Sequence, residues 1–264
     1  MASLLDSSIH AHTLIPESGR SVKILVVGDS EVGKTSLVHL LCHKVPLSRP
    51  LYTTGCSLEV KVHEHFSDKT DVSSRELFYL EFWDIGGSIA YEKSRYLFYD
   101  SADGIVLVHD LTNRNSHDNL RKWLKGVLTD RNKVQGKKGH KYTNSDDYGK
   151  GFDAEIYTNS AMPAIIIGTK KDLSRSSNEL ISHSSLATDI NAQVIAVNCR
   201  KASDFTPGAP EMQCLNAFFD KVICQKYYSQ TSLPREEEIS DLGSSRRGSW
   251  LRQFTQSLNS SFST

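Results

Sequence analysis

The chain alternates between short apolar runs and segments whose apolar residues recur at helical spacing. Nearly continuous apolar runs are typical of strands buried on both faces of a sheet. Such runs occupy residues 22–27, 104–110, 163–169 and 193–197. Residues 56–63 instead alternate between apolar and polar side chains, which predicts a half-buried strand near a sheet edge. Residues 76–83 are the strand expected to return beside it.

The segments between these strands predict helices. One helix is expected over about 34–44, and a second begins at a cap formed by Asn115 or Ser116. The second helix has a 3.6-residue apolar spacing at Leu120, Trp123, Leu124, Val127 and Leu128. A last helical face closes the domain with Met212, Leu215, Phe218, Phe219, Val222 and Ile223. This order indicates an α/β fold with a mostly parallel six-stranded sheet, helices on both faces and one antiparallel edge hairpin.

Composition divides the chain into one domain and several polar segments. Residues 1–20 predict a flexible extension, and residues 21–229 a single domain. Inside that domain, residues from about 130 to 161 are polar and lack periodicity, so we expect a long surface insertion there. Beyond about Tyr228 the chain is rich in Ser, Glu, Arg and Gln, which predicts a disordered tail over 230–264.

The charge balance indicates which kinds of partner the chain can bind, and the cysteines indicate the compartment in which it is found. The chain carries 31 Lys and Arg against 31 Asp and Glu, so bulk charge gives no basis for nucleic-acid binding. Five scattered cysteines without a CxxC pair favour a reduced, cytoplasmic location. No apolar run approaches the roughly 18–20 residues of a membrane span. Ala2 excludes N-myristoylation and the last four residues include no cysteine to prenylate, so we expect no covalent lipid anchor and at most peripheral membrane contact.

The segment Gly28–Thr35 matches the pattern GxxxxGK[ST] and lies between a predicted strand and a predicted helix. That context favours a phosphate-binding loop over an ordinary glycine-containing turn. Backbone N–H groups at a helix start attract an anion, Lys34 can reach the β and γ phosphates, and the Thr35 hydroxyl can bind Mg²⁺. The nucleotide contacts predicted in this region are Ser30, Glu31, Val32, Gly33, Lys34, Thr35 and Ser36.

Three later segments predict which nucleotide binds. Asp84 ends a strand before Gly86 and Gly87, where an aspartate holds the metal, directly or through water, and a glycine N–H meets the γ phosphate. The segments after the last two predicted strands are Thr169-Lys170-Lys171-Asp172 and Asn198-Cys199-Arg200. The Asp172 carboxylate can accept two hydrogen bonds from guanine, whereas adenine has no matching pair of donors. Backbone N–H groups of the second segment can meet the guanine carbonyl.

These segments, in this order, resemble those of the Ras-superfamily small GTPases, Rab branch, which have the P-loop NTPase fold. A narrower resemblance, to the Rab-like protein 3 family, rests on Gly55-Cys56-Ser57, Trp83-Asp84-Ile85-Gly86-Gly87-Ser88, Val108-His109-Asp110-Leu111-Thr112-Asn113 and Gly168-Thr169-Lys170. It covers about 21–229 and implies GTP or GDP with Mg²⁺ as cofactors. It also implies effector and regulatory proteins, none of which the sequence identifies, and it allows a homodimer.

The resemblance assigns roles to individual residues. It makes Lys34 the phosphate lysine, adds Thr53 to Thr35 as a Mg²⁺ ligand in the GTP state, and makes Asp84 the holder of the metal's water shell. The Gly87 N–H senses the γ phosphate. The implied catalytic set is Lys34, Thr53, Gly87 and Ser88. Two segments, Val45–Gly55 and Gly86–Tyr96, are then held by the γ phosphate and Mg²⁺ and released when the phosphate leaves.

Three residues depart from the family pattern. Ser88 stands where most relatives carry the glutamine that orients the attacking water, so we expect slow intrinsic hydrolysis. Thr169 replaces the usual asparagine and loses an amide that bonds the base and ties loops together. Glu31 replaces a glycine or alanine and brings a carboxylate near the phosphates.

Three classes of function remain open at this point. The first is a guanine-nucleotide switch that recruits partners in its GTP form. The second is an interaction or scaffold protein that GTP stabilises, with negligible turnover, which Ser88 favours. The third is a P-loop kinase or ATPase, which leaves Asp172 without a role because adenine has no donor pair for it.

Overall fold

The computed structural model describes residues 19–67, 72–134, 162–174 and 184–229. The expected extension over 1–20, apart from its last two residues, and the expected tail over 230–264 lie outside these ranges. The chain divides into a unit Met1–Ile223 and a unit Cys224–Thr264. Of the second unit, the structure describes residues 224–229, which include the end of the last helix.

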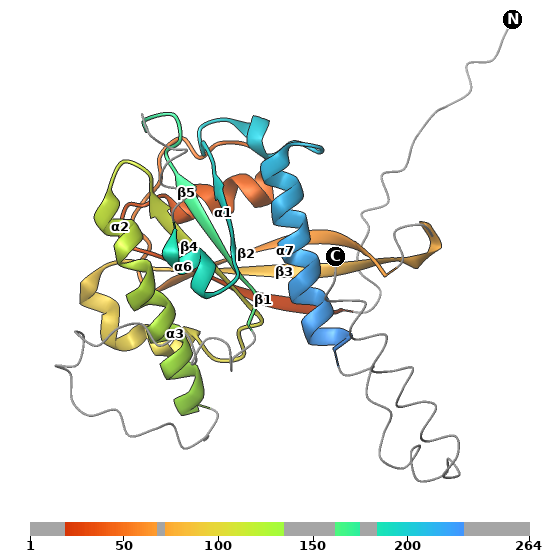
Figure 1. The fold of residues 1–264 in the computed structure, drawn as a ribbon, viewed down its shortest axis with the longest axis horizontal. Helices are drawn as coiled ribbons and strands as arrows, with labels where there is room; N and C mark the ends of the chain where they lie inside the picture. The colour runs from red at the N-terminus through yellow and green to blue at the C-terminus, as the bar shows by residue number, and fades with distance from the viewer. Residues whose placement is uncertain (1–18, 68–71, 135–161, 175–183, 230–264) are drawn as a thin grey trace, which may run out of the picture. The chain divides into compact units, whose positions relative to one another are not determined.

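The described strands form a six-stranded sheet in the order β2-β3-β1-β4-β5-β6 (Figure 1). The strands are β1 (Ser21–Val27), β2 (Cys56–Phe66), β3 (Arg75–Ile85), β4 (Gly104–Asp110), β5 (Ala164–Thr169) and β6 (Gln193–Ala196). The pair β2–β3 is antiparallel, and every other neighbouring pair is parallel. The predicted α/β sheet with one antiparallel edge hairpin is therefore confirmed.

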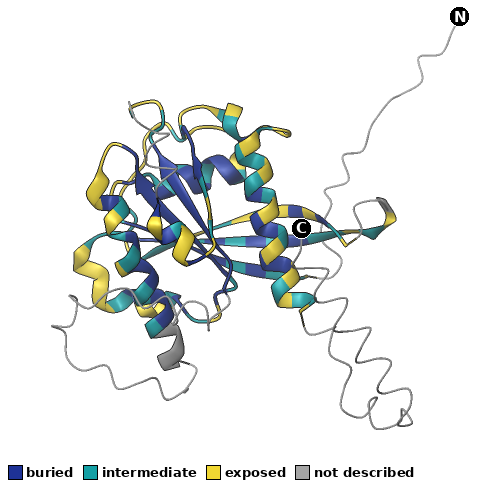
Figure 2. Cartoon of the chain, viewed as in Figure 1, coloured by how far each residue is buried: buried dark blue, intermediate teal, exposed yellow. Residues whose placement is uncertain are grey.

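Helices cover the sheet. The α-helices are α1 (Lys34–His43), α2 (Arg114–Asp118), α3 (Leu120–Val134), α6 (Ser185–Asp189) and α7 (Pro210–Tyr227), and the 3-10 helices are η1 (Val72–Ser74), η2 (Ile89–Phe98) and η3 (Ala202–Phe205). Apolar residues of α3 and α6 share one buried cluster with the central strands, and almost all residues of β1, β4 and β5 are buried (Figure 2). Helix α7 places Phe219 edge-on against Phe82 of β3. None of the described helices is both long and apolar enough to span a membrane.

Two boundaries differ from the sequence prediction. The helix cap expected at Asn115 or Ser116 is Asn113, whose side chain accepts a hydrogen bond from the Asn115 N–H. Ser116 is buried and its hydroxyl instead donates to the Asn113 carbonyl. Helix α3 continues to Val134, so the first residues of the predicted insertion, 130–134, are helical rather than a surface loop. The rest of that predicted insertion, 135–161, lies outside the described residues.

Strand β2 is the predicted edge strand, but its less exposed face is the polar one. Its apolar residues Leu58, Val60 and Val62 are 50, 48 and 41% exposed. The opposite face carries His63 and His65, both buried, whose ring nitrogens lie 3.0 and 2.8 Å from the Asp220 carboxylate on α7. This face is covered because the two imidazoles find a charged partner on α7, and the period-2 pattern alone does not reveal that partner.

His109 is a buried residue of β4, and its burial makes the stability of the fold sensitive to acid. Burial lowers the pKa of His109 to about 4, and the neighbouring ring of His117 adds to the effect. In the unfolded chain a histidine has a pKa near 6.5. Below pH 6.5 His109 is therefore protonated in the unfolded state but stays neutral in the folded state. The free energy of unfolding falls as the pH drops toward 4.

We expect the free energy of unfolding to fall by about 2 kcal/mol between pH 7 and pH 5 because of His109 alone. In the variant His109→Phe, which keeps an aromatic ring beside His117, this part of the pH dependence should disappear. Urea unfolding of both proteins at the two pH values measures the difference. Parallel pH profiles for wild type and variant would show that His109 is not the responsible group.

Candidate functional site

The loop between β1 and α1 has the backbone of an anion-binding cradle. Gly28 has a φ of +151°, and a Cβ there would lie 2.1 Å from the Val108 carbonyl oxygen, so only glycine fits. Glu31 and Gly33 also have positive φ angles of 65° and 94°. Helix α1 begins at Lys34 with no side-chain cap and no acidic residue in its first turn. A helix start that lacks both features is suited to an external anion.

The Lys34 side chain lies along the inside of this loop. Its Nζ donates hydrogen bonds to the carbonyl oxygens of Gly28 at 2.9 Å and Asp29 at 2.7 Å. Burial lowers the pKa of Lys34 to about 8, and the carboxylates of Asp84 and Asp29 oppose that effect. The ammonium is thus a buried cation at the loop, placed as a phosphate-binding lysine requires.

The two carboxylates of the phosphate loop, Asp29 and Glu31, accept hydrogen bonds from residues outside the loop. Asp29 accepts hydrogen bonds from Asn119 Nδ2 and Trp123 Nε1, each at 2.8 Å. Glu31 accepts a hydrogen bond from the hydroxyl of Tyr52, which belongs to the segment before β2. This bond raises the pKa of Tyr52. The carboxylate of Glu31, expected near the phosphates, is therefore held to the Val45–Gly55 segment.

Two hydroxyls and one carboxylate meet beside the start of α1. Asp84 Oδ2 accepts hydrogen bonds from Thr35 Oγ1 at 2.6 Å and from Thr53 Oγ1 at 3.0 Å. The two hydroxyl oxygens lie 2.9 Å apart. The Asp84 side chain is 1% exposed, and its Oδ1 has no hydrogen-bond partner among the described residues. Burial raises the pKa of Asp84, although Thr35, Lys34 and Thr53 oppose it.

These three residues fit a magnesium ion. All of their donor atoms are oxygens, which Mg²⁺ prefers. A buried carboxylate oxygen without a partner is costly, and a bound cation removes that cost. The structure thus brings together Thr35, Thr53 and Asp84, the three ligands that the sequence and the resemblance predict.

The glycines after Asp84 lie between two neighbouring backbones. The Gly86 N–H donates to the Gly55 carbonyl at 2.8 Å, and a Cβ on Gly86 would lie 2.6 Å from the Thr53 carbonyl oxygen. A Cβ on Gly87 would lie 2.4 Å from the Ser30 nitrogen. Gly87 therefore lies directly against the phosphate loop.

Ser88 begins η2 rather than reaching into the site. Its hydroxyl accepts a hydrogen bond from the Ala90 N–H at 3.4 Å and so caps the helix. A serine hydroxyl that serves as a helix cap has no free reach toward a water beyond the glycines.

The residues predicted to bind the base gather at the ends of β5 and β6. Lys170 has a φ of +57°, and its Nζ lies 2.7 Å from Asp110 Oδ2 at the end of β4. Burial raises the pKa of the Cys199 thiol to about 12, and the charge of Asp172 adds to this, which places Asp172 beside Cys199. The Asn198 Oδ1 accepts a hydrogen bond from the Arg200 N–H at 2.9 Å. The end of β5 lies beside the phosphate loop, because the Thr169 hydroxyl is within hydrogen-bond distance of the Val32 carbonyl. The Lys171 N–H donates to the Val197 carbonyl at 3.2 Å, which joins this segment to the end of β6, and Asp172 is exposed there.

Comparison with known proteins agrees with this geometry. Residues 23–136 match the family model described as "Ras of Complex, Roc, domain of DAPkinase". Rab-like protein 3 of Mus musculus is 39% identical over 214 residues, which is 78% of this chain and 86% of that protein. Rab-like protein 3 of Homo sapiens is 38% identical over the same shares. The chain belongs to the Rab-like protein 3 family of Ras-like small GTPases.

A plant small GTPase is similar to a shorter part of the chain. The small GTPase LIP1 of Arabidopsis thaliana is 41% identical over 119 residues, 43% of this chain and 34% of that protein. Members of the small GTPase family bind guanine nucleotides, usually with Mg²⁺, and hydrolyse GTP.

Thr169 keeps one role of the asparagine that small GTPases usually have at this position, namely the contact that joins two loops. Its hydroxyl lies within hydrogen-bond distance of the Val32 carbonyl in the phosphate loop and 3.1 Å from the His109 carbonyl. The Thr169 side chain is buried and lies 3.4 Å from the position of a Cβ on Gly33. The expectation that the loop tie is lost here is wrong, because the threonine hydroxyl makes that tie through a shorter side chain.

Two residues of this small GTPase site, Trp123 and Arg95, are not predicted from the sequence. Trp123, assigned only to the core, donates to Asp29 of the phosphate loop. It also lies under the guanidinium of Arg95, with 4.1 Å from Cζ to the ring centroid. Arg95 in turn donates to the Gly86 carbonyl at 3.1 Å and the Ser88 carbonyl at 2.8 Å. The available sequence signal for the role of Trp123 is Asp29, an aspartate inside the phosphate-loop pattern. No residue near Arg95 in the sequence indicates the role of Arg95.

Proposed function

We propose that this chain is a guanine-nucleotide-dependent switch that binds GTP and GDP with Mg²⁺, hydrolyses GTP slowly and recruits partner proteins in its GTP form. One observation carries the proposal. Thr53 of the Val45–Gly55 segment and Thr35 of α1 converge on the buried Asp84 carboxylate, beside Lys34 and an uncapped helix start. A phosphate-bound cation is what joins hydroxyls from two separate segments in a nucleotide switch.

Each part of the chain has a task in this scheme. Thr35, Thr53 and Asp84 hold the metal, which neutralises charge on the phosphate oxygens when it is bound. Lys34 and the first N–H groups of α1 hold the phosphates. Asp172 accepts two guanine N–H groups, and Gly87 offers its N–H to the terminal phosphate.

The same contacts explain how nucleotide state changes the surface. Thr53 ties one segment to the metal cluster, and Gly86 ties the next segment to Gly55. Removal of the terminal phosphate weakens both attachments and releases the two segments. Large apolar side chains are exposed on these segments and just beyond, namely Leu51 (84%), Tyr52 (76%), Ile89 (83%) and Leu97 (62%). They give a partner protein a surface that depends on the bound nucleotide.

Slow hydrolysis follows from Ser88. We expect an intrinsic rate at or below the order of 10⁻⁴ s⁻¹ found for unaided Ras-type proteins, because the serine side chain is short and caps η2. The variant Ser88→Gln should raise the rate, since glutamine reaches the attacking water. Single-turnover hydrolysis of radiolabelled GTP measures both rates.

The variant Ser88→Ala is the matched control. It removes the hydroxyl without adding an amide, so its rate should stay close to that of the wild type. A wild-type rate on the order of 1 s⁻¹ without a partner, or a marked loss of rate in Ser88→Ala, would show that the serine itself orients the water.

A second candidate function is an interaction or scaffold protein in which GTP is a permanent structural component. The serine at position 88 favours it. Chromatography of the nucleotide released from purified protein separates the candidates. Bound GDP supports the hydrolysing switch, retained GTP supports the scaffold, and ATP contradicts both.

A further inference from the structure

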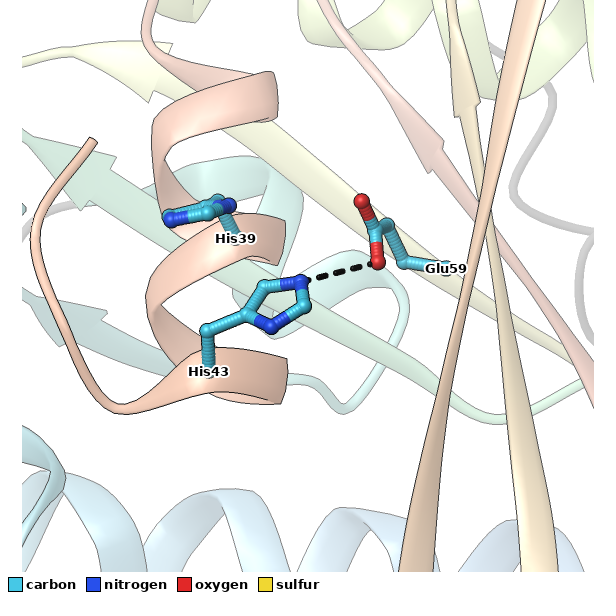
Figure 3. Close-up of side chains that lie close together, drawn as sticks. All are labelled: His39, His43 and Glu59. Carbon is cyan, nitrogen blue, oxygen red and sulfur yellow. Dashed lines mark hydrogen bonds and ion pairs between the residues drawn. The ribbon is translucent and has the colours of Figure 1, made fainter. Parts of the chain in front are cut away.

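Two imidazoles and a carboxylate gather where α1 ends beside β2 (Figure 3). His39 and His43 are one helical turn apart and extend from the same face of α1. Their ring centroids are 4.4 Å apart. Glu59 of β2 lies opposite, with its Oε2 3.1 Å from His43 Nε2. One ligand atom from each of the three residues lies within 4.8 Å of the other two.

We propose that His39, His43 and Glu59 form a zinc site. Two histidines spaced i and i+4 on a helix, with a glutamate from another element, are a donor set that binds Zn²⁺ through three protein ligands and leaves one position to water. Tetrahedral ligands about 2.0–2.1 Å from zinc lie about 3.4 Å from each other. The 3.1 Å between His43 and Glu59 is close to that spacing, so ring rotation of His39 completes the set.

An ordinary ion pair does not account for the whole arrangement. The pair between His43 and Glu59 is partly exposed, at 47 and 35% of the two side chains, and such pairs contribute little. The His39 ring lies beside that of His43 at an interplanar angle of 35°, and it has no hydrogen-bond partner among the described residues. Two imidazolium rings at this distance repel each other, whereas two neutral imidazoles can both bind one cation.

The choice of zinc follows from the donors and their charge. Two neutral imidazoles and one carboxylate carry a charge of −1, so bound Zn²⁺ leaves a local charge of +1. Imidazole nitrogen suits zinc better than it suits Mg²⁺ or Ca²⁺, which prefer an all-oxygen set. The metal of the Thr35–Thr53–Asp84 cluster therefore does not compete for this site. The thiol of Cys42, next to His43 in sequence, does not belong to the group of atoms that gather here.

The position of the site gives the metal a structural task. His43 is the last residue of α1, and Glu59 lies in the first half of β2, so the metal joins the two ends of the segment that carries Thr53. A cavity of about 410 Å³ beneath that segment is lined by His39 and Glu59 and also by Thr35, Thr53 and Asp84. Bound zinc fixes one wall of this cavity. The zinc site itself does not depend on the proposed switch function.

The test is a Zn²⁺ titration of the full chain after metal removal, in competition with a chromophoric chelator. We expect one zinc ion that requires all three residues. The variants His39→Gln, His43→Gln and Glu59→Gln should each bind zinc at least about tenfold more weakly, since loss of even an outer-shell partner costs 10–100-fold in affinity. Zinc should raise the thermal unfolding temperature of the wild type but not of these variants.

Two controls keep the result specific. Glu64→Gln also removes a β2 glutamate from an ion pair, with Arg75 at 3.3 Å, but lies outside the cluster and should bind zinc like the wild type. Cys42→Ser should also leave zinc binding unchanged, and Co²⁺ in the site should lack a thiolate charge-transfer band. Absence of zinc binding by the wild type, equal binding by all three ligand variants, or loss of binding in Cys42→Ser would each overturn the proposal.

Discussion

Replacement of Asp172 by asparagine should shift the preference of the chain from guanosine to xanthosine nucleotides. In the proposed binding mode the carboxylate accepts hydrogen bonds from two guanine N–H groups, and each bond to a charged group contributes about 1.5–3 kcal/mol. We therefore expect GTP affinity to fall roughly 100-fold or more. The amide of asparagine can donate to the xanthine oxygen, so binding of xanthosine triphosphate should rise. Competition between the two nucleotides for one fluorescent analogue measures both changes.

Asp118→Asn is the matched control, because Asp118 is an exposed aspartate of α2 that pairs with its neighbour His117 at 3.6 Å and belongs to neither predicted base-binding segment. It should leave both affinities as they are. Unchanged GTP affinity in Asp172→Asn would remove the assignment of the base-binding residue. It would leave the assignment of the phosphate loop intact, since that rests on Lys34 and the start of α1.

Replacement of Arg95 by methionine should lower the free energy of unfolding by about 3 kcal/mol. The arginine is 8% exposed and donates to the carbonyls of Gly86 and Ser88. Loss of its donors leaves these carbonyls without a charged partner, at about 1.5–3 kcal/mol each, and ends the stacking on Trp123. Methionine retains apolar volume against the indole, which limits the loss. Chemical unfolding of the variant and the wild type measures the difference.

Two further variants isolate the cause. Arg95→Lys keeps the positive charge but lacks the planar pair of donors, so it should recover only part of the stability. Arg121→Met removes a partly exposed α3 arginine that pairs with Asp189 at 2.8 Å, and should cost less than about 1 kcal/mol. Equal stability losses in Arg95→Met and Arg121→Met would mean that Arg95 does not hold the segment after Asp84.

Features that depend on neighbours in sequence are predictable here. The strands and the phosphate loop are predicted correctly because their signals are local: apolar runs, a glycine-framed loop, and a lysine and threonine that start a helix. Thr35, Thr53 and Asp84 also meet as expected. Thr35 and Asp84 meet because β1 and β3 are parallel neighbours, so that the residues at their carboxyl ends lie at one edge of the sheet. Thr53 comes before β2, and only the family resemblance predicts its place beside them.

Features that depend on a distant partner are not predictable in this way. The inward face of β2 is polar because Asp220 lies opposite it, and that residue is 155 positions after His65. The role of Trp123 depends on Asp29, 94 positions earlier. The sequence predicts a lost loop tie at Thr169 because the contact of its hydroxyl with the Val32 carbonyl spans 137 positions. Residue type alone gives no information about such pairings.

The bond between His65 and Asp220 also has a consequence for how the chain folds as it is made. Ribosomes add roughly 5–20 residues per second. The 155 residues that separate the two partners therefore take about 8–30 s to synthesise. During that interval the β2–β3 hairpin can pair, because its strands are adjacent in sequence, but its two histidines have no carboxylate from α7. The edge of the sheet that forms early is thus completed only when the last helix emerges.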